Sequence, residues 1–150
     1  MTVINILLFF KIGPSAPPVL PSQPEIPGQC GRGYDGYHYK YYKEEKTWID
    51  AQTTCKNEGG NLAIINNYHT RDVVKSFMKW GWIGITDQWQ EGIWQTPSGE
   101  NVTFTLWRHG EPNNYLGDED CAMEMEPGNW NDVDCNTVGP FVCQFHAGED

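Results

Sequence analysis

Five widely spaced cysteines limit the folds open to this chain more than any other feature of its sequence. They are Cys30, Cys55, Cys121, Cys135 and Cys143. No two of them form a CxxC pair, the spacing that zinc sites use, so disulfide bonds in an oxidising compartment are the better interpretation. An odd count leaves at least one cysteine without a partner in the chain, and spacing alone leaves the pairing of the others open.

Length and composition indicate one folded domain behind a linker. The 150 residues suffice for one domain, and a hydrophobic content of 39% is typical of globular chains rather than disordered ones. Six prolines between positions 14 and 27 mark an extended spacer. We therefore expect an N-terminal apolar segment and Pro-rich linker at 1–27 and the domain at 28–150.

A short apolar run at 3–10 follows Met1. It is too short to span a membrane, which takes about 20 apolar residues, so no membrane span is expected. The run has the character of a secretory signal core but lacks the preceding positive charges, so a cleaved signal, a truncated signal and a leftover of expression are all open. The sequon Asn101-Val102-Thr103 adds weak support for a secreted, extracellular protein.

The net charge of -10 argues against nucleic acid as a partner, because binding phosphates requires a basic face. Much of the negative charge lies in one stretch, 111–134, which contains no Lys or Arg. Its acidic residues are Glu111, Asp118, Glu119, Asp120, Glu124, Glu126, Asp132 and Asp134. Such a cluster repels itself unless solvent or bound cations compensate it, so it is either a solvated surface or a cation site.

Hydrophobic periodicity predicts two helices. The first follows the N-capping residue Thr47, turns an apolar face formed within 48–55 toward the core, and ends at 58–60. The second is capped by Thr70 and ends before Gly81.

Short strands are predicted around these helices. Their ranges are 34–42 (a strand or a hairpin), 62–65 (a short strand or a buried turn), 82–85, 104–107, 121–125 and 141–145. Turn residues prevail between 87 and 120, and a loop region of that length is uncommon unless it is functional. Two helices, antiparallel strands and a long loop region together predict an α+β fold.

Oxygen-bearing side chains concentrate in two predicted loops, at 110–121 and 128–132. Calcium takes about 6–8 oxygen ligands, which Asp, Glu and Asn supply, whereas zinc prefers Cys and His, and only His109 lies nearby. Asn, Asp and Gly are also ordinary turn residues, so composition alone supports a structural interpretation as readily as a calcium site.

Short motifs in these segments resemble a known family. Glu111-Pro112-Asn113, then Trp130-Asn131-Asp132, then Cys143 are similar to the signature of calcium-binding C-type lectin domains. Trp82-Ile83-Gly84-Ile85 resembles the WIGL core motif of that family. The resemblance extends over roughly 30–145 and is closest to the mannose-binding collectin and dendritic-cell lectin branches. It implies the C-type lectin fold with disulfide bonds Cys55–Cys143 and Cys121–Cys135.

The same resemblance implies two Ca²⁺ sites. The site for calcium and sugar together falls on Glu111, Asn113, Glu119, Asn131 and Asp132. The auxiliary site falls on Asp87, Glu91, Asn114, Glu119 and Asp120. Asn114 is an amide where some members carry Asp, which removes a charge from the auxiliary site. Tyr115 either contacts an extended glycan or only fills the loop, and Pro112 is expected to be cis.

The order Glu-Pro-Asn is associated, in this family, with mannose, N-acetylglucosamine, glucose and fucose. The resemblance therefore implies calcium-dependent binding of mannose-type glycans on cell or microbial surfaces, with a calcium-dependent protein ligand as the alternative. An enzyme is not expected, since the chain has no GxSxG or HExxH motif. Cys30 is left over because its usual partner position holds Tyr41, so it either joins two chains into a homodimer or stays a capped or free thiol.

Overall fold

The computed structural model describes residues 29–32, for which the backbone alone is placed, and 36–148. This part of the chain contains two α-helices, α1 (Trp48–Asn57) and α2 (Tyr68–Lys75), and a short 3-10 helix, η1 (Tyr115–Gly117). The strands are β1 (Gln29–Arg32), β2 (Tyr37–Lys46), β3 (Asn61–Leu62), β4 (Trp80–Thr86), β5 (Cys121–Met125), β6 (Asn129–Val133) and β7 (Gly139–His146). The predicted α+β class is confirmed, whereas the expectations for 1–27 and for the thiol of Cys30 lie outside the described residues.

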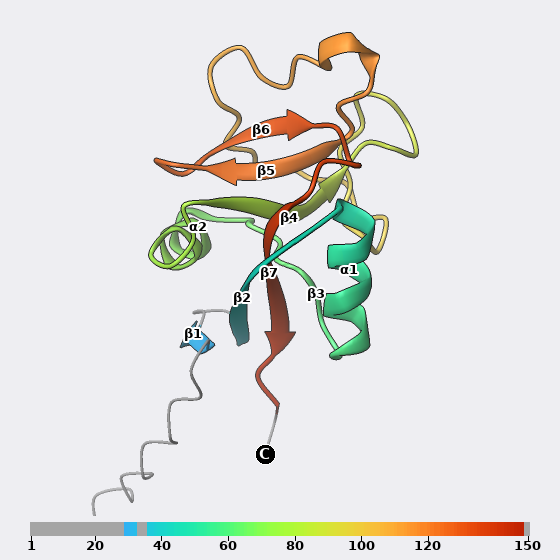
Figure 1. Ribbon diagram of the computed structural model, residues 1–150. Helices are drawn as coiled ribbons and strands as arrows, with labels where there is room; N and C mark the ends of the chain where they lie inside the picture. Colours follow the sequence, from blue (N-terminus) through green and yellow to red (C-terminus); the bar gives the residue numbers. More distant parts are fainter. Residues whose placement is uncertain (1–28, 33–35, 149–150) are drawn as a thin grey trace, which may run out of the picture.

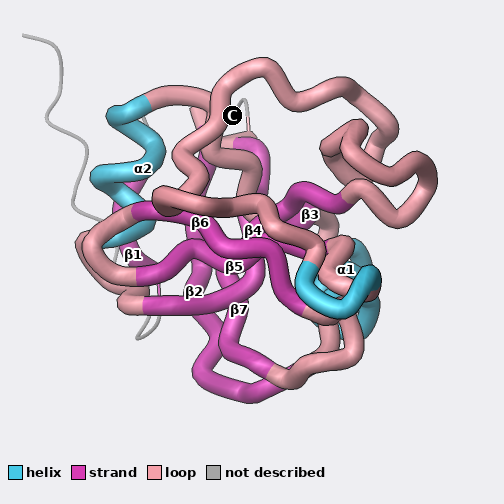
Figure 2. The backbone as a smooth tube through the Cα atoms, turned by 90° about the horizontal axis from the view of Figure 1, so that it is seen from above, coloured by secondary structure: helices cyan, strands magenta, loops and turns pink. Residues whose placement is uncertain are grey.

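The strands form one sheet in the order β1-β2-β7-β4-β5-β6, and β3 pairs with β7. All pairs are antiparallel except β4 and β7, which run parallel where Trp82 meets Phe141. The expectation of antiparallel strands throughout is wrong at this pair, because β7 returns into the middle of the sheet and lies between β2 and β4. Figures 1 and 2 show α1 and α2 on opposite sides of the strands.

Each face of the sheet buries its own apolar cluster, since successive strand residues point to opposite faces. One cluster contains Trp48, Ala51 and Cys55 of α1 together with Trp82, Met123 and Phe141. The other contains Val74 of α2 and Met78 together with Ile83, Ala122 and Val142. Consecutive residues along β4, β5 and β7 therefore alternate between the two clusters. Ala122 and the residues on the same face of the sheet form the side that α2 covers.

Both helices begin at a side-chain cap. The Thr47 hydroxyl accepts the Asp50 N–H at 3.3 Å, as predicted for the first helix. The prediction that Thr70 caps the second helix is wrong: the Asn67 side chain accepts the Thr70 N–H at 2.8 Å, and Thr70 is buried one turn inside α2. Gly81, which was expected to follow the end of this helix, lies instead in β4, because α2 already ends at Lys75. Neither of these described helices has the length and apolar character to cross a membrane.

Two disulfide bonds tie distant parts of the chain together, and they are the pairs that the resemblance implies. Cys55 of α1 is bonded to Cys143 of β7, and Cys121 of β5 to Cys135, which follows β6. A bridge of this kind typically contributes about 2–4 kcal/mol to stability. The second bridge closes the open end of the β5–β6 hairpin.

Residues 87–120 form the expected long loop region, which extends beyond β5 and β6 in Figure 1 (yellow-green to orange). The strand predicted at 104–107 is wrong, because Trp107 makes only an isolated bridge to Trp130 there. The loop predicted at 128–132 is also wrong, since most of it belongs to β6. Gly and Asn in that segment suggested a turn, but Trp130 alternates with polar neighbours as a half-buried strand does.

Candidate functional site

β6 is the support of the candidate site. Trp130, within this strand, is fully buried. Its backbone N–H donates to the Leu106 carbonyl and its carbonyl accepts the Arg108 N–H, both at 2.8 Å. These two hydrogen bonds hold the chain segment that leads to Glu111 against the strand that carries Asp132.

Asp132 anchors the loop that faces it. The side chain is fully buried, and its Oδ1 accepts the Asn113 N–H at 3.2 Å while its Oδ2 accepts the Asn114 N–H at 2.6 Å. Asn114 has a φ of 45°, in the left-handed region that Asn enters more readily than most residues. Asn131 precedes Asp132 in β6, is half-buried, and is connected to the site through this neighbour.

Glu111, Asn113 and Glu119 extend the network around Asp132. The Asn113 side-chain N–H donates to Glu111 Oε1 at 3.2 Å. The Tyr115 N–H is shared between Asn113 Oδ1 at 3.1 Å and Glu119 Oε2 at 2.9 Å. Four of the five residues predicted for calcium and sugar therefore meet in one hydrogen-bonded network.

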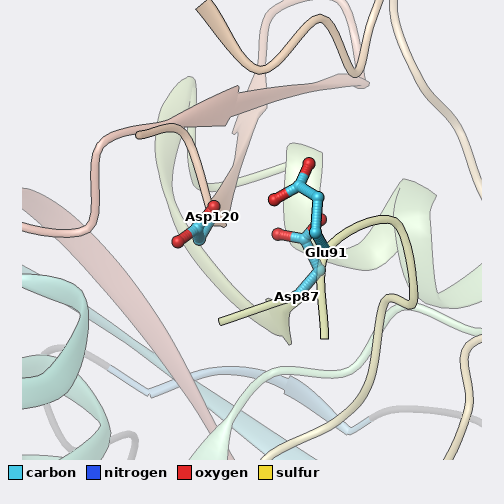
Figure 3. A group of neighbouring side chains, drawn as sticks. All are labelled: Asp87, Glu91 and Asp120. Carbon is cyan, nitrogen blue, oxygen red and sulfur yellow. The ribbon is translucent and has the colours of Figure 1, made fainter. Parts of the chain in front are cut away.

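Asp87, Glu91 and Asp120 form a second carboxylate group, shown in Figure 3. One oxygen from each lies within 4.8 Å of the other two. Asp87 follows β4 and is buried, and its Oδ2 accepts the Gly92 N–H at 2.8 Å. Asn114 links this group to the first network, because its side chain donates to Glu91 Oε1 at 2.8 Å. The structure thus brings together the residues predicted for the auxiliary site.

Three carboxyl groups of these two networks, those of Glu111, Glu119 and Asp87, have raised pKa values. Burial, with the hydrogen bond and charge of Asp132, raises the pKa of Glu111 to about 7. Burial also raises the pKa of Glu119 and of Asp87, and the charge of neighbouring carboxylates acts in the same direction on both. Repulsion of this kind among clustered carboxylates favours either protons or a bound cation.

Three buried carboxylate oxygens in these groups lack a hydrogen-bond partner within the described part of the chain. They are Asp87 Oδ1, Glu111 Oε2 and Asp120 Oδ1. A buried oxygen without a partner costs free energy, and a cation beside it would remove that cost. Because the assembled donors are carboxylate and amide oxygens, the residues fit calcium in both charge and ligand type.

Other singled-out residues have clear positions. The Glu111–Pro112 bond is cis, the expected isomer, and the Tyr115 side chain is 65% exposed.

Sequence reasoning missed Glu124, which it grouped with the other carboxylates of the acidic stretch. This side chain is 1% exposed, and the signal was its place two residues after Ala122, on the inward face of a strand.

A model of the lectin C-type domain matches residues 44–145, which include every residue of the two networks. The chain belongs to the C-type lectin domain family. The predicted resemblance is therefore confirmed, and the chain is a carbohydrate-recognition domain of that family.

Individual members of the C-type lectin family agree with this assignment. The chain is 35% identical over 130 residues to the C-type lectin lectoxin-Lio1 of Erythrolamprus poecilogyrus, covering 77% of this chain and 80% of that protein. It is similar to the carbohydrate-recognition domain of the mouse scavenger receptor C-type lectin, with a TM-score of 0.75 and 28% identity over 82% of this chain and 98% of the other. The carbohydrate-recognition domain of cow CD23 was solved in the presence of a GlcNAc2Man3 oligosaccharide. Its comparison with this chain gives a TM-score of 0.73 and 27% identity, over 80% of this chain and 98% of that domain.

Proposed function

We propose that this C-type lectin domain binds mannose-type sugars (mannose, N-acetylglucosamine and fucose) on glycans of cell or microbial surfaces, and that binding depends on calcium. The residues that would hold calcium with the sugar are Glu111, Asn113, Glu119, Asn131 and Asp132. The residues that would hold an auxiliary calcium are Asp87, Glu91, Asn114, Glu119 and Asp120. The proposal is carried by the hydrogen-bonded network of Glu111, Asn113 and Asp132, in which the buried Glu111 Oε2 receives no hydrogen bond from the residues that the structure describes.

Calcium bound in this network would accept two neighbouring hydroxyl oxygens of a sugar as ligands. The protons of those hydroxyls then need acceptors, which the carboxylates of Glu111 and Glu119 supply. The remaining hydroxyl lone pairs need donors, which the amides of Asn113 and Asn131 supply. Carboxylates alone would provide no donors, and this explains the mixture of acids and amides in the site.

Existing hydrogen bonds already orient part of this set. Asn113 Oδ1 accepts the Tyr115 N–H, and the Asn113 nitrogen points to Glu111 Oε1. The amide is thereby fixed with its donor side toward a carboxylate, so a donor and an acceptor stand side by side. A pair of adjacent sugar hydroxyls requires that arrangement, and little side-chain freedom would be lost on binding.

Mannose-type selectivity rests on the identity of the two residues that flank Pro112. The carboxylate precedes the proline at Glu111 and the amide follows it at Asn113, which is the order that the family resemblance associates with mannose. The structurally similar domain of cow CD23 was solved with an oligosaccharide of N-acetylglucosamine and mannose, which supports this class of ligand.

A calcium-dependent protein ligand is the second candidate. Tyr115 and Leu116 are 65% and 82% exposed, and they follow directly on Asn113 and Asn114. Exposed apolar side chains beside a binding site suit a protein partner as well as an extended glycan. In the glycan proposal, Tyr115 contacts sugar residues beyond the one at the calcium.

The setting of the domain is proposed as extracellular, with 28–150 as the folded unit behind a linker at 1–27. Two disulfide bonds favour an oxidising compartment. Cys30 would join two chains into a homodimer. Because a shallow sugar site binds a monosaccharide weakly, pairing two domains would raise the effective affinity for a surface with many glycans.

Retention on mannose-agarose in millimolar calcium tests the proposal. We expect the protein to bind, to elute with EDTA and with free mannose, and to elute poorly with galactose. Elution by galactose as readily as by mannose would refute the selectivity. Failure to bind, together with a rise in melting temperature on adding calcium, would keep the metal site and transfer the function to a protein ligand or a larger glycan.

A further inference from the structure

A small cavity lies on the α2 side of the sheet, away from the residues proposed for calcium. It has a volume of about 160 Å³ and lies between the end of α2 and the turn that joins β5 to β6. A Cβ atom at Gly128 in that turn would come within 2.9 Å of Arg71 Cδ and 3.3 Å of Lys75 Cδ, so α2 packs closely against the turn. Met78, Met125 and Pro127 supply apolar lining.

Glu124 is the polar group in the wall of this cavity. It is in β5, in register with Trp130 and two residues beyond Ala122, so its side chain faces the α2 side of the sheet. The side chain is 1% exposed, and neither Oε1 nor Oε2 has a hydrogen-bond partner within the described residues. A buried carboxyl group with both oxygens unpaired is costly for a fold and invites a ligand that donates to both.

The charged groups around the cavity, within the described residues, donate no hydrogen bond to Glu124. Arg71 and Lys75 of α2 lower the pKa of Glu124 and Asp72 raises it, but burial dominates and brings the pKa to about 7. Arg71 Nε donates to Asp72 Oδ1 at 2.8 Å and its Cζ lies 5.2 Å from the centroid of the Tyr68 ring, so these two side chains orient the guanidinium in the structure. Lys79 and Glu126 complete the charged groups at the lining, and both are exposed.

We propose that this cavity is a second binding site, which takes a small guanidinium compound whose paired N–H groups donate to both oxygens of Glu124. A guanidinium presents parallel donors that match the two oxygens of a carboxylate. It is also more weakly hydrated than an ammonium, so it suits a cavity with methionine and proline walls. A divalent metal ion fits poorly, because it requires about six oxygens or more and the two carboxyl groups of the lining, Glu124 and Glu126, supply four.

Titration of the whole chain with N-methylguanidinium, followed by amide NMR, tests this site. We expect saturable shifts at Met125 and Gly128, with half-saturation below about 10 mM, since a ligand of few atoms binds weakly. Methylammonium should shift the same amides much less at equal concentration. Equal shifts with methylammonium would overturn the assignment to a guanidinium, and linear shifts without saturation would overturn the site.

Two variants separate Glu124 from general charge effects. Glu124→Gln keeps the shape of the side chain, and it should lose the saturable shifts. Glu100→Gln removes one exposed carboxylate of the loop region at 87–120, which does not line the cavity, and this variant should keep the saturable shifts. Shifts that persist in Glu124→Gln would contradict the proposal. If that variant does not fold, the wild-type titration decides, because binding should weaken as the pH falls below about 7 only if Glu124 is the acceptor.

A third variant tests whether the protein's own lysine occupies the site. Lys75 is exposed at the lining of the cavity, and its flexible side chain could turn inward in solution. The proposal expects Lys75→Gln to bind N-methylguanidinium about as well as the wild type does. Binding that is absent in the wild type and present only in Lys75→Gln would overturn the proposal, and it would assign Lys75 as the partner of Glu124.

Discussion

Individual side chains in the sugar site differ in one respect that decides selectivity, namely whether they donate or accept hydrogen bonds. Replacing Glu111 with Gln and Asn113 with Asp exchanges those roles on either side of Pro112. The double variant should prefer galactose and lose mannose affinity by about tenfold or more, since each mispaired polar group costs about 1–3 kcal/mol. Competitive elution from immobilised mannose and immobilised galactose measures the change.

Asp118→Asn is a suitable control for that exchange, because Asp118 is exposed in the same loop and belongs to neither network. It should keep the preference for mannose. A double variant that also keeps its mannose preference would show that the assignment of donors and acceptors is wrong.

Glu124 should make stability depend on pH in the direction opposite to most carboxylates. Its pKa is about 7 in the folded protein, against the ordinary value of 4.5 for this side chain, so folding favours the protonated form. Its contribution is most favourable below about pH 4.5 and is lost as the pH rises through 7, by roughly 3 kcal/mol in all. Glu124→Gln should therefore raise the urea midpoint at pH 8 and leave it nearly unchanged at pH 4.5. An equal gain at both pH values would point to packing instead of charge.

At the scale of single elements, α2 depends on its cap. The Asn67 side chain accepts the Thr70 N–H at 2.8 Å, and Asn67→Ala removes that acceptor from the first turn. We expect a loss of about 1 kcal/mol in the free energy of unfolding, measured by urea denaturation. Asn66→Ala keeps the capping acceptor and removes only an exposed hydrogen bond, from Asn67 Nδ2 to Asn66 Oδ1 at 2.8 Å, so it should lose less. Similar losses for both variants would argue against the capping role.

The same element shows what a sequence reveals about this fold. Thr47 and Thr70 fit a capping pattern equally well, but the cap of α2 is Asn67, three residues before Thr70. This earlier start turns Val74 toward the core. Local patterns therefore locate helices and miss their ends.

Residues of the site were predictable to a different degree. The loop that carries Glu111 and Asn113 was identified from its motif, whereas the strand character of β6 was concealed by its Asn and Gly residues. The sequence predicts the strand at 121–125 but not the burial of Glu124, because Glu124 belongs to an acidic stretch that is typical of a solvated surface or a cation site. The family resemblance implies that Asp87 and Asp120 lie close together, whereas local sequence patterns do not, since it is the ends of β4 and β5 that bring the two residues together.

Over the whole molecule, folding brings six of the chain's 20 acidic residues into two adjoining carboxylate groups. Calcium binding there must displace protons, and the pKa of Glu111 is about 7 before any metal binds. Apparent calcium affinity should therefore fall on the order of tenfold as the pH is lowered from about 7.5 to about 5.5. Isothermal titration calorimetry with limiting calcium measures this dependence, and sugar binding should decline with it.

Acid unfolding must be distinguished from this competition. Because a ligand that binds the folded state raises its melting temperature, saturating calcium should raise it at both pH values, while at pH 5.5 more calcium is needed for the same rise. A calcium affinity that does not change between the two pH values would refute the competition. A melting temperature that collapses at pH 5.5 even in saturating calcium would instead assign the loss of sugar binding to unfolding, and the raised pKa of Glu111 would then have no part in releasing the sugar.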